Sequence, residues 1–337
     1  MKLKANAKIN LFLDILNKRK DGYHNIKTVF QEISLPDKIF INEIKTGTPL
    51  KRDSVSIVCD NPFIPTDKTN LVYKAADSIK KYSGIKKGVL IEIKKRIPVG
   101  AGLGGGSSDA AAVLKGLNKL WELNLTKNQL VKMAKKIGAD VPFFIEGGRC
   151  LGEGIGAQLT PLKIRKTKWY VLVKPSFEIS TKFAYSLLTP LEMSHRDTVS
   201  LTELTKSNKI SKITPINIGV TLNESEGSHQ PSPKRFFANA QNDNICFNKL
   251  EDIIIPRYPE IKKIKEKLVD CGAEFSLMSG SGSCVFGFVK NKSIGEKIKN
   301  KMKKDGYAVW LVHSIKAENR KTEIRKMENG DLGKSKP

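Results

Sequence analysis

Apolar and polar residues alternate along the first part of the chain. From residue 3 to residue 15 the odd positions are apolar, while the even positions include Lys8 and Asn10. A period of two predicts a β-strand with one face in the core, and it places Lys8 and Asn10 side by side on the other face. Asp21-Gly22 is a hairpin turn signal, so residues 23–33 should form an antiparallel neighbour of this strand.

The rest of the chain mixes strand-like and helix-like patterns. Strands are expected at 38–43, 55–59, 89–95, 169–174 and 307–314, and helices at 69–82, 110–121, 126–137 and 294–304. This order predicts an α/β fold, with helices and sheet in two layers.

A length of 337 residues favours two domains. We expect an N-terminal domain over 1–162 and a C-terminal domain over 163–317, followed by a charged tail over 318–337. Residues 206–244 lose hydrophobic periodicity and predict a disordered insert.

A glycine-rich segment joins the strand at 89–95 to the helix at 110–121. It reads Pro98-Val99-Gly100-Ala101-Gly102-Leu103-Gly104-Gly105-Gly106-Ser107-Ser108-Asp109. Glycines let a ligand approach the main chain, Ser107 to Asp109 would cap the helix, and a helix N-terminus favours a phosphate. A dinucleotide-binding unit would need a second strand after the helix, and a P-loop would need a lysine after the glycines, so neither pattern fits. A tight turn without a ligand is the alternative.

Four further residues are candidates for functional chemistry. Asp140, in Gly138-Ala139-Asp140-Val141-Pro142, is either a catalytic carboxylate or the cap of a new helix with a proline in its first turn. Tyr23 and His24 lie at the mouth of the hairpin, where they could stack on and bind a nucleobase or form an ordinary cross-strand pair. Tyr185 is a candidate second aromatic for that base, and an exposed helical tyrosine is its alternative.

Composition narrows the function classes. The 59 Lys and Arg residues against 34 Asp and Glu give a net charge of +25, which would suit nucleic acid, but no basic run is interleaved with aromatics. The charge is better explained by solvated surfaces that attract small polyanions such as nucleotides. No apolar run is long enough for a membrane span and no signal sequence opens the chain, so we expect a cytoplasmic location. The five cysteines lack metal-ligand spacing and predict reduced thiols, and no residue is assigned to a metal site.

The glycine segment strongly resembles the ATP-binding motif of the GHMP kinases, and the resemblance extends over about residues 3–316. It implies a two-domain fold with the active site in the cleft between the domains, and ATP and Mg²⁺ as cofactors. Pro98 to Ser108 would then bind ATP, Asp140 would be the general base, and Lys8 would be the active-site lysine that polarises the acceptor hydroxyl. The glycine turn within 277–288 resembles a further family motif that braces the phosphate loop.

Residues 7–13 and 19–24 are similar to the N-terminal signature of one branch of this family. That branch phosphorylates the 2-hydroxyl of a cytidine diphosphate conjugate of methylerythritol, in non-mevalonate isoprenoid synthesis. The similarity implies that Asn10, Tyr23, His24 and Tyr185 bind this small-molecule substrate. It implies no nucleic-acid or membrane partner, and a monomer or homodimer. A homoserine-type or mevalonate-type GHMP kinase, or a non-enzymatic basic nucleic-acid-binding protein, are the alternatives.

Overall fold

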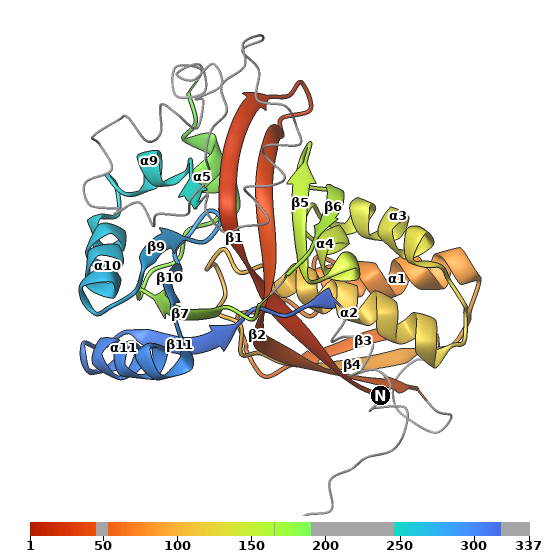
Figure 1. Ribbon diagram of the computed structural model, residues 1–337. Coiled ribbons are helices and arrows are strands. Elements are labelled where there is room, and N and C mark those ends of the chain that lie inside the picture. Colours follow the sequence, from red (N-terminus) through yellow and green to blue (C-terminus); the bar gives the residue numbers. More distant parts are fainter. Residues whose placement is uncertain (45–52, 165, 190–245, 318–337) are drawn as a thin grey trace, which may run out of the picture.

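The structure is a computed structural model that describes residues 1–44, 53–164, 166–189 and 246–317. It contains two β-sheets with helices around them (Figure 1), which confirms the predicted α/β class. The predicted insert at 206–244 and the tail at 318–337 lie outside the described residues.

The larger sheet has the strand order β3-β4-β2-β1-β8, with β5 paired to β2 and β6 paired to β5. Its strands are β1 (Lys2–Lys18), β2 (His24–Glu43), β3 (Val55–Cys59), β4 (Val89–Lys94), β5 (Arg149–Glu153), β6 (Gln158–Leu162) and β8 (Phe247–Asn248). β1 and β2 are antiparallel, as the hairpin signal predicted. The sequence pattern suggested separate strands at 23–33 and 38–43, but β2 is continuous. Its Pro36 lies opposite Asn6 at a register shift, where a missing backbone N–H is tolerated.

The prediction that β1 buries only one face is wrong for its middle. Lys8 is 4% exposed and Asn10 is 2% exposed, so the even positions are buried as well as the odd ones. The odd positions at Ala7 and Ile9 belong to a cluster with Leu172 of the smaller sheet. The even face is covered instead by the glycine segment, because a methyl group at Gly104 would lie 3.2 Å from the Lys8 side chain.

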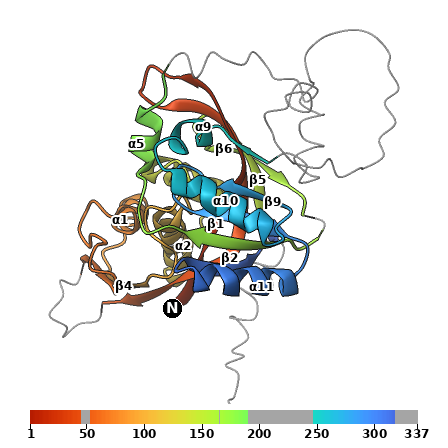
Figure 2. The ribbon, with the colours of Figure 1, turned by 90° about the vertical axis from the view of Figure 1, so that its left-hand side faces the viewer.

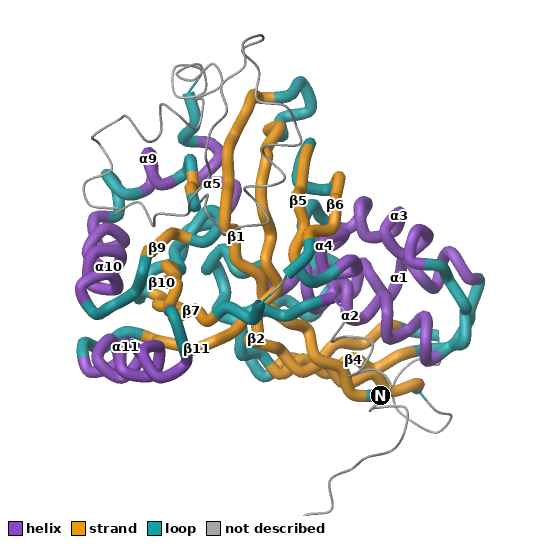
Figure 3. Tube along the Cα trace, viewed as in Figure 1, coloured by secondary structure: helices purple, strands orange, loops and turns teal. Residues whose placement is uncertain are grey.

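Helices pack against the larger sheet on the side away from the smaller one (Figures 1 and 3). They are α1 (Leu71–Ser83), α2 (Gly105–Leu120), α3 (Lys127–Ile137) and α4 (Val141–Glu146). A capping box of Thr126 and Gln129 starts α3, as predicted. No helix in the described part of the chain is long and apolar enough to cross a membrane.

The start of α2 differs from the sequence prediction. The helix begins at Gly105, with Gly104 as its N-cap at φ 69°, so Ser107, Ser108 and Asp109 lie inside its first turns and do not cap it. The left-handed conformation of Gly104 ends the preceding turn earlier than the apolar pattern suggested. Ser108 instead donates a hydrogen bond of 2.6 Å to the carbonyl of Asn6, which ties α2 to β1.

The smaller sheet is antiparallel in the order β11-β7-β10-β9. Its elements are β7 (Trp169–Lys174), β9 (Phe275–Met278), β10 (Val285–Val289) and β11 (Ala308–His313), with helices α5 (Thr181–Ser186), α9 (Glu251–Ile254), α10 (Pro259–Asp270) and α11 (Lys292–Lys304). α10 and α11 run side by side over one face of this sheet (Figure 2), and the other face packs toward the larger sheet. The strands β1, β2 and β4 each contribute side chains to the wall of the cavity described next.

Candidate active site

The glycine segment, β1, α5 and a second glycine turn line one cavity of about 390 Å³. Every predicted ATP-binding residue from Pro98 to Ser107 lines it, together with Lys8, Asn10, Asp140 and Tyr185. Ser108 does not, because its side chain is buried against β1. The fold therefore brings together residues from distant parts of the chain that were predicted to bind phosphate, to act as the general base and to bind the substrate.

The glycine segment is held open by positive φ angles and by the second glycine turn. Gly100, Gly102 and Gly104 have φ angles of 60°, 70° and 69°, which residues with a Cβ atom rarely adopt. A methyl group at Gly102 would lie only 2.0 Å from the Ser279 carbonyl oxygen, and the Ser279 hydroxyl donates to the Gly102 carbonyl at 3.1 Å. The second turn thus packs directly against the phosphate-binding candidate.

Lys8 is fixed by a chain of buried hydrogen bonds. Its Nζ donates to Asn10 Oδ1 at 2.6 Å, and Asn10 Nδ2 donates to Thr28 Oγ1 at 2.8 Å. Thr28 donates in turn to the Phe12 carbonyl at 2.7 Å. Because each member has a partner, the ammonium group is held in one place at the cavity wall.

Asp140 faces Lys8. The two side chains approach to 3.5 Å between Asp140 Oδ2 and Lys8 Nζ, and they are 32% and 5% exposed. Asp140 occupies the N-cap position of α4, but its carboxylate makes no capping hydrogen bond. The carboxylate is therefore directed to the cavity and does not serve the helix, which removes the simple capping interpretation.

The predicted substrate-binding aromatic residues differ in whether they reach the cavity. Tyr185 lines the cavity, and its ring lies 5.4 Å from that of His24, which is 7% exposed. Burial, and to a lesser degree the charge of Lys18, lowers the pKa of His24. Burial, with a contribution from Asp140, raises the pKa of Tyr185. Tyr23 is 58% exposed and does not line the cavity.

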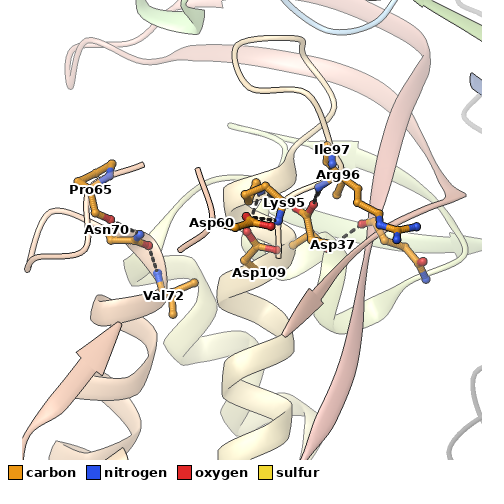
Figure 4. Close-up of polar contacts among 11 residues, drawn as sticks. Asp37, Asp60, Pro65, Asn70, Val72, Lys95, Arg96, Ile97 and Asp109 are labelled. Atoms are coloured by element: carbon orange, nitrogen blue, oxygen red, sulfur yellow. Dashed lines mark hydrogen bonds and ion pairs between the residues drawn. The ribbon is translucent and has the colours of Figure 1, made fainter. Parts of the chain in front are cut away.

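A cluster of buried charges beside the glycine segment was missed from the sequence. Lys95 Nζ donates to Asp37 Oδ2 at 2.5 Å and to Asp109 Oδ2 at 2.9 Å (Figure 4). Burial lowers the pKa of Lys95, but Asp109 and Asp37 outweigh this and raise it above its usual value. Burial raises the pKa of Asp109 to about 7; Asp37 adds to this effect and Lys95 opposes it. The sequence placed Lys95 only as the last residue of the strand expected at 89–95, and no local pattern indicated its partners.

A second missed residue supports the second glycine turn. Asn248, which is 2% exposed, donates from Nδ2 to the carbonyls of Met278 at 2.8 Å and Gly280 at 2.7 Å. A methyl group at Gly280 would lie 3.1 Å from Asn10 Oδ1 and 3.4 Å from Lys8 Nζ. Asn248 therefore holds the backbone that packs against the Lys8 and Asn10 pair.

Comparison with known proteins agrees with this arrangement. The family model "GHMP kinases N terminal domain" matches residues 70–148, and "GHMP kinases C terminal" matches residues 229–308. These matches confirm the predicted two-domain fold, while the boundary at residue 162 stays a prediction. The cavity is lined from both matched regions, by the glycine segment and by Gly280.

Individual relatives cover almost the whole chain. A 4-diphosphocytidyl-2-C-methyl-D-erythritol kinase of Clostridium botulinum (strain Alaska E43 / Type E3) is 39% identical over 94% of this chain and 100% of its own length. One from Thermodesulfovibrio yellowstonii is 41% identical over 87% of this chain and 91% of its own.

Solved structures show the same fold. A crystal structure of 4-(cytidine 5'-diphospho)-2C-methyl-D-erythritol kinase matches with a TM-score of 0.69 and 28% identity, over 93% of this chain and 99% of that chain. A homoserine kinase from Cytophaga hutchinsonii matches with a TM-score of 0.63 and 17% identity over 94% of each chain. At this lower identity the likeness shows the fold alone.

Proposed function

This chain belongs to the 4-diphosphocytidyl-2-C-methyl-D-erythritol kinases of the GHMP kinase family, and we propose that it transfers the γ-phosphoryl group of ATP to the 2-hydroxyl of 4-diphosphocytidyl-2-C-methyl-D-erythritol. The observation that carries the proposal is the Lys8 and Asp140 pair beside the glycine segment, in a chain 39% identical to a kinase of that name. A homoserine or mevalonate substrate has weaker support, because those likenesses are 17% and 13% in sequence.

Some residues of the site position the phosphates of ATP, and others act on the acceptor hydroxyl and its proton. The amides of the glycine segment and the N-terminus of α2 hold the phosphates of ATP. An acceptor hydroxyl placed beside this pair is within hydrogen-bond reach of both Lys8 Nζ and the Asp140 carboxylate, because the two groups are 3.5 Å apart. Lys8 stabilises the developing negative charge on the oxygen, and Asp140 takes the proton. The γ-phosphoryl bond to the leaving ADP breaks as the bond to the acceptor oxygen forms.

Mg²⁺ fits this site with few protein ligands. In the described residues there is no group of three or more His, Cys, Asp or Glu side chains that could hold a metal. Mg²⁺ commonly uses one or two protein oxygens together with substrate phosphates, so a separate cage is not required. Ser107, which lines the cavity in the first turn of α2, would supply such an oxygen. When bound, Mg²⁺ neutralises charge on the phosphate oxygens.

We assign the remaining side chains of the site to binding of the acceptor substrate. Asn10 and Tyr185 line the cavity, and the ring of His24 lies 5.4 Å from the ring of Tyr185. We assign these residues to the cytidine conjugate, whose phosphorylation is a step of non-mevalonate isoprenoid synthesis. The five cysteines are present as thiols, which supports a reducing, cytoplasmic setting.

A substrate comparison tests the proposal. Purified protein with ATP and Mg²⁺ is given the cytidine conjugate, homoserine or mevalonate, and ADP release is followed with a coupled assay. We expect turnover with the conjugate only, and ³¹P NMR of the product should place the new phosphate on the 2-hydroxyl. Equal turnover of homoserine or mevalonate, or no ADP release with the conjugate, would contradict the assignment.

A further inference from the structure

The second glycine turn packs closely against the Lys8 and Asn10 pair. At Gly280 the φ angle is 55°, and an added methyl group would lie 3.1 Å from Asn10 Oδ1 and 3.4 Å from Lys8 Nζ. The space between this backbone and the pair is therefore too small for a side chain. Lys8 and Asn10 are 4% and 2% exposed, and the hydrogen bond of 2.6 Å between them is strengthened by its shielding from water.

Asn248 holds the turn from its other side. Its Nδ2 donates to the carbonyls of Met278 at 2.8 Å and Gly280 at 2.7 Å, and its Oδ1 accepts from the backbone N–H of Leu250 at 3.0 Å. Both N–H groups and the carbonyl oxygen of the amide are thus engaged. The amide cannot turn without breaking these bonds, so it fixes the position of the Gly280 carbonyl.

Asn248 is itself tied to the strand that carries Lys8. β8 pairs in parallel with β1, with Asn248 opposite Leu13, and the backbone N–H of Lys249 donates to the Leu13 carbonyl at 2.8 Å. The same strand therefore contacts the turn directly at Lys8 and supports it indirectly through Asn248. The distance from the Gly280 backbone to Lys8 is set by both contacts.

We propose that Asn248 is a positioning residue for phosphoryl transfer, which acts by holding the Gly280 backbone against Lys8. The inference rests on the proposed function, because it takes Lys8 as the group that stabilises charge on the acceptor oxygen. A charged group contributes to such a reaction only when it is held in place beforehand. Asn248 does not line the cavity formed by the described residues, whereas Gly280 does, so the effect of Asn248 passes through the turn.

Removing the two donors of Asn248 tests the proposal. Asn248→Asp keeps the shape and the acceptor for Leu250, but its carboxylate would face two carbonyl oxygens and release Gly280. Asn248→Ala removes the same donors without adding a charge. We expect both variants to lower kcat by roughly 10- to 100-fold and to leave the KM values for ATP and the cytidine conjugate close to those of the parent. An unchanged kcat would overturn the inference.

A second background separates positioning from a general loss of stability. In Lys8→Met the group that Asn248 positions is gone, so adding Asn248→Ala should lower kcat little further. Equal losses in the parent and in the Lys8→Met background would show that Asn248 supports the fold only.

Gly280→Ala disturbs the same contact without changing Asn248. Its methyl group would meet Asn10 Oδ1 at 3.1 Å, so kcat should fall by a similar factor, and this holds even where Asn248→Ala folds poorly. An unchanged kcat in Gly280→Ala would refute the path through the turn.

Glu251→Gln is the matched control. Glu251 Oε1 accepts from the backbone N–H of Met278 at 2.6 Å, so it holds the same end of β9 but has no bond to the Gly280 carbonyl. Its kcat should stay close to the parent value. A fall as large as that in Asn248→Ala would show that any loosening of β9 is sufficient, and would refute the specific role of Asn248.

Crystal structures of the parent and of Asn248→Ala test the inference without turnover. We expect the variant to show a displaced Gly280 carbonyl and a longer distance between Lys8 Nζ and Asn10 Oδ1 than the 2.6 Å of the parent. Unchanged geometry would overturn the role of Asn248. A displaced turn in the variant, together with no turnover of the conjugate by the parent, would support that role and overturn the proposed substrate.

Discussion

The ring of Tyr185 lies 5.4 Å from the ring of His24, with the two planes tilted by 43°. The contact joins α5 to the hairpin of β1 and β2. Tyr185 also lines the cavity. An aromatic wall supported in this way offers a stacking surface for a nucleobase.

Replacing this wall should weaken binding of the cytidine conjugate. We expect Tyr185→Ala to raise the KM for the conjugate by roughly 5- to 150-fold, the range for loss of one base-stacking contact, and to leave the KM for ATP unchanged. Tyr185→Phe keeps the ring and should resemble the parent. Steady-state kinetics with each substrate varied in turn checks this, and an effect on ATP alone would contradict it. The same measurement on Tyr23→Ala decides the sequence prediction for exposed Tyr23, since an unchanged KM would remove it from the substrate site.

Asp140→Asn should retain ATP binding but lower kcat by roughly 10²-fold or more, because the amide cannot accept the hydroxyl proton. Calorimetry with ATP and single-turnover kinetics separate the two effects. Asp270→Asn, an exposed position at the end of α10, serves as the control and should leave kcat unchanged. A kcat for Asp140→Asn within a small factor of the parent value would rule out the general-base role.

Lys8 and Asn10 should act as one unit. We expect Lys8→Met to lower kcat by roughly 10²- to 10³-fold through lost charge stabilisation. Asn10→Ala should lower it by roughly 10-fold, because Lys8 loses the partner at 2.6 Å. The double variant should be no slower than Lys8→Met, since Asn10 acts through Lys8. Additive losses, with a raised KM for the conjugate in Asn10→Ala, would indicate that Asn10 contacts the substrate directly, as the sequence predicted.

Gly102→Ala should destabilise the glycine segment. The added methyl group would meet the Ser279 carbonyl at 2.0 Å, and the φ of 70° disfavours any side chain. We expect a loss of about 2 kcal/mol or more in unfolding free energy and weaker nucleotide binding. Gly138→Ala is the control, since its backbone is extended and the nearest neighbour of a new methyl group lies at 3.4 Å. Equal melting temperatures for the two variants would contradict the close approach.

The protonation of Asp109 should be visible in stability. Its pKa of about 7 is raised above the ordinary 3.8, so the folded state binds the proton more tightly than the unfolded chain between about pH 4 and about pH 7. This contribution favours the folded state at low pH and is lost as the pH rises through 7. Asn does not titrate, so the unfolding free energy of the parent minus that of Asp109→Asn should fall between pH 5 and pH 8. Urea unfolding at several pH values measures this difference; a constant or rising difference would contradict the raised pKa.

Local signals predicted much of this molecule. The Asp21-Gly22 turn indicated the antiparallel pair, and Thr126 with Gln129 indicated the start of α3. The glycine segment carries its pattern within a few adjacent residues, whereas Asp140 was selected through the resemblance of its Gly-Ala-Asp-Val-Pro context; the structure brings both to one cavity, and their roles stay predictions.

Contacts between distant residues could not be predicted in the same way. Lys95 meets Asp37 from 58 positions away, and nothing in the alternation near either residue indicates a buried charge. The burial of both faces of β1 depends on a glycine segment and a second sheet that lie far along the chain. Such features follow from how the elements pack together, which a local periodicity does not contain.

The approach of Gly280 to Lys8 and Asn10 has a consequence for protein synthesis. Lys8 and Asn10 are synthesised about 270 residues before the Gly280 backbone that packs on them, and Asn248, which holds that backbone, follows Asn10 by 238 residues. A nascent chain that stops before residue 280 carries the lysine, the glycine segment and Asp140 without their brace. The candidate site is therefore complete only once residue 280 has been synthesised, because the packing against Lys8, Asn10 and Gly102 does not exist before then.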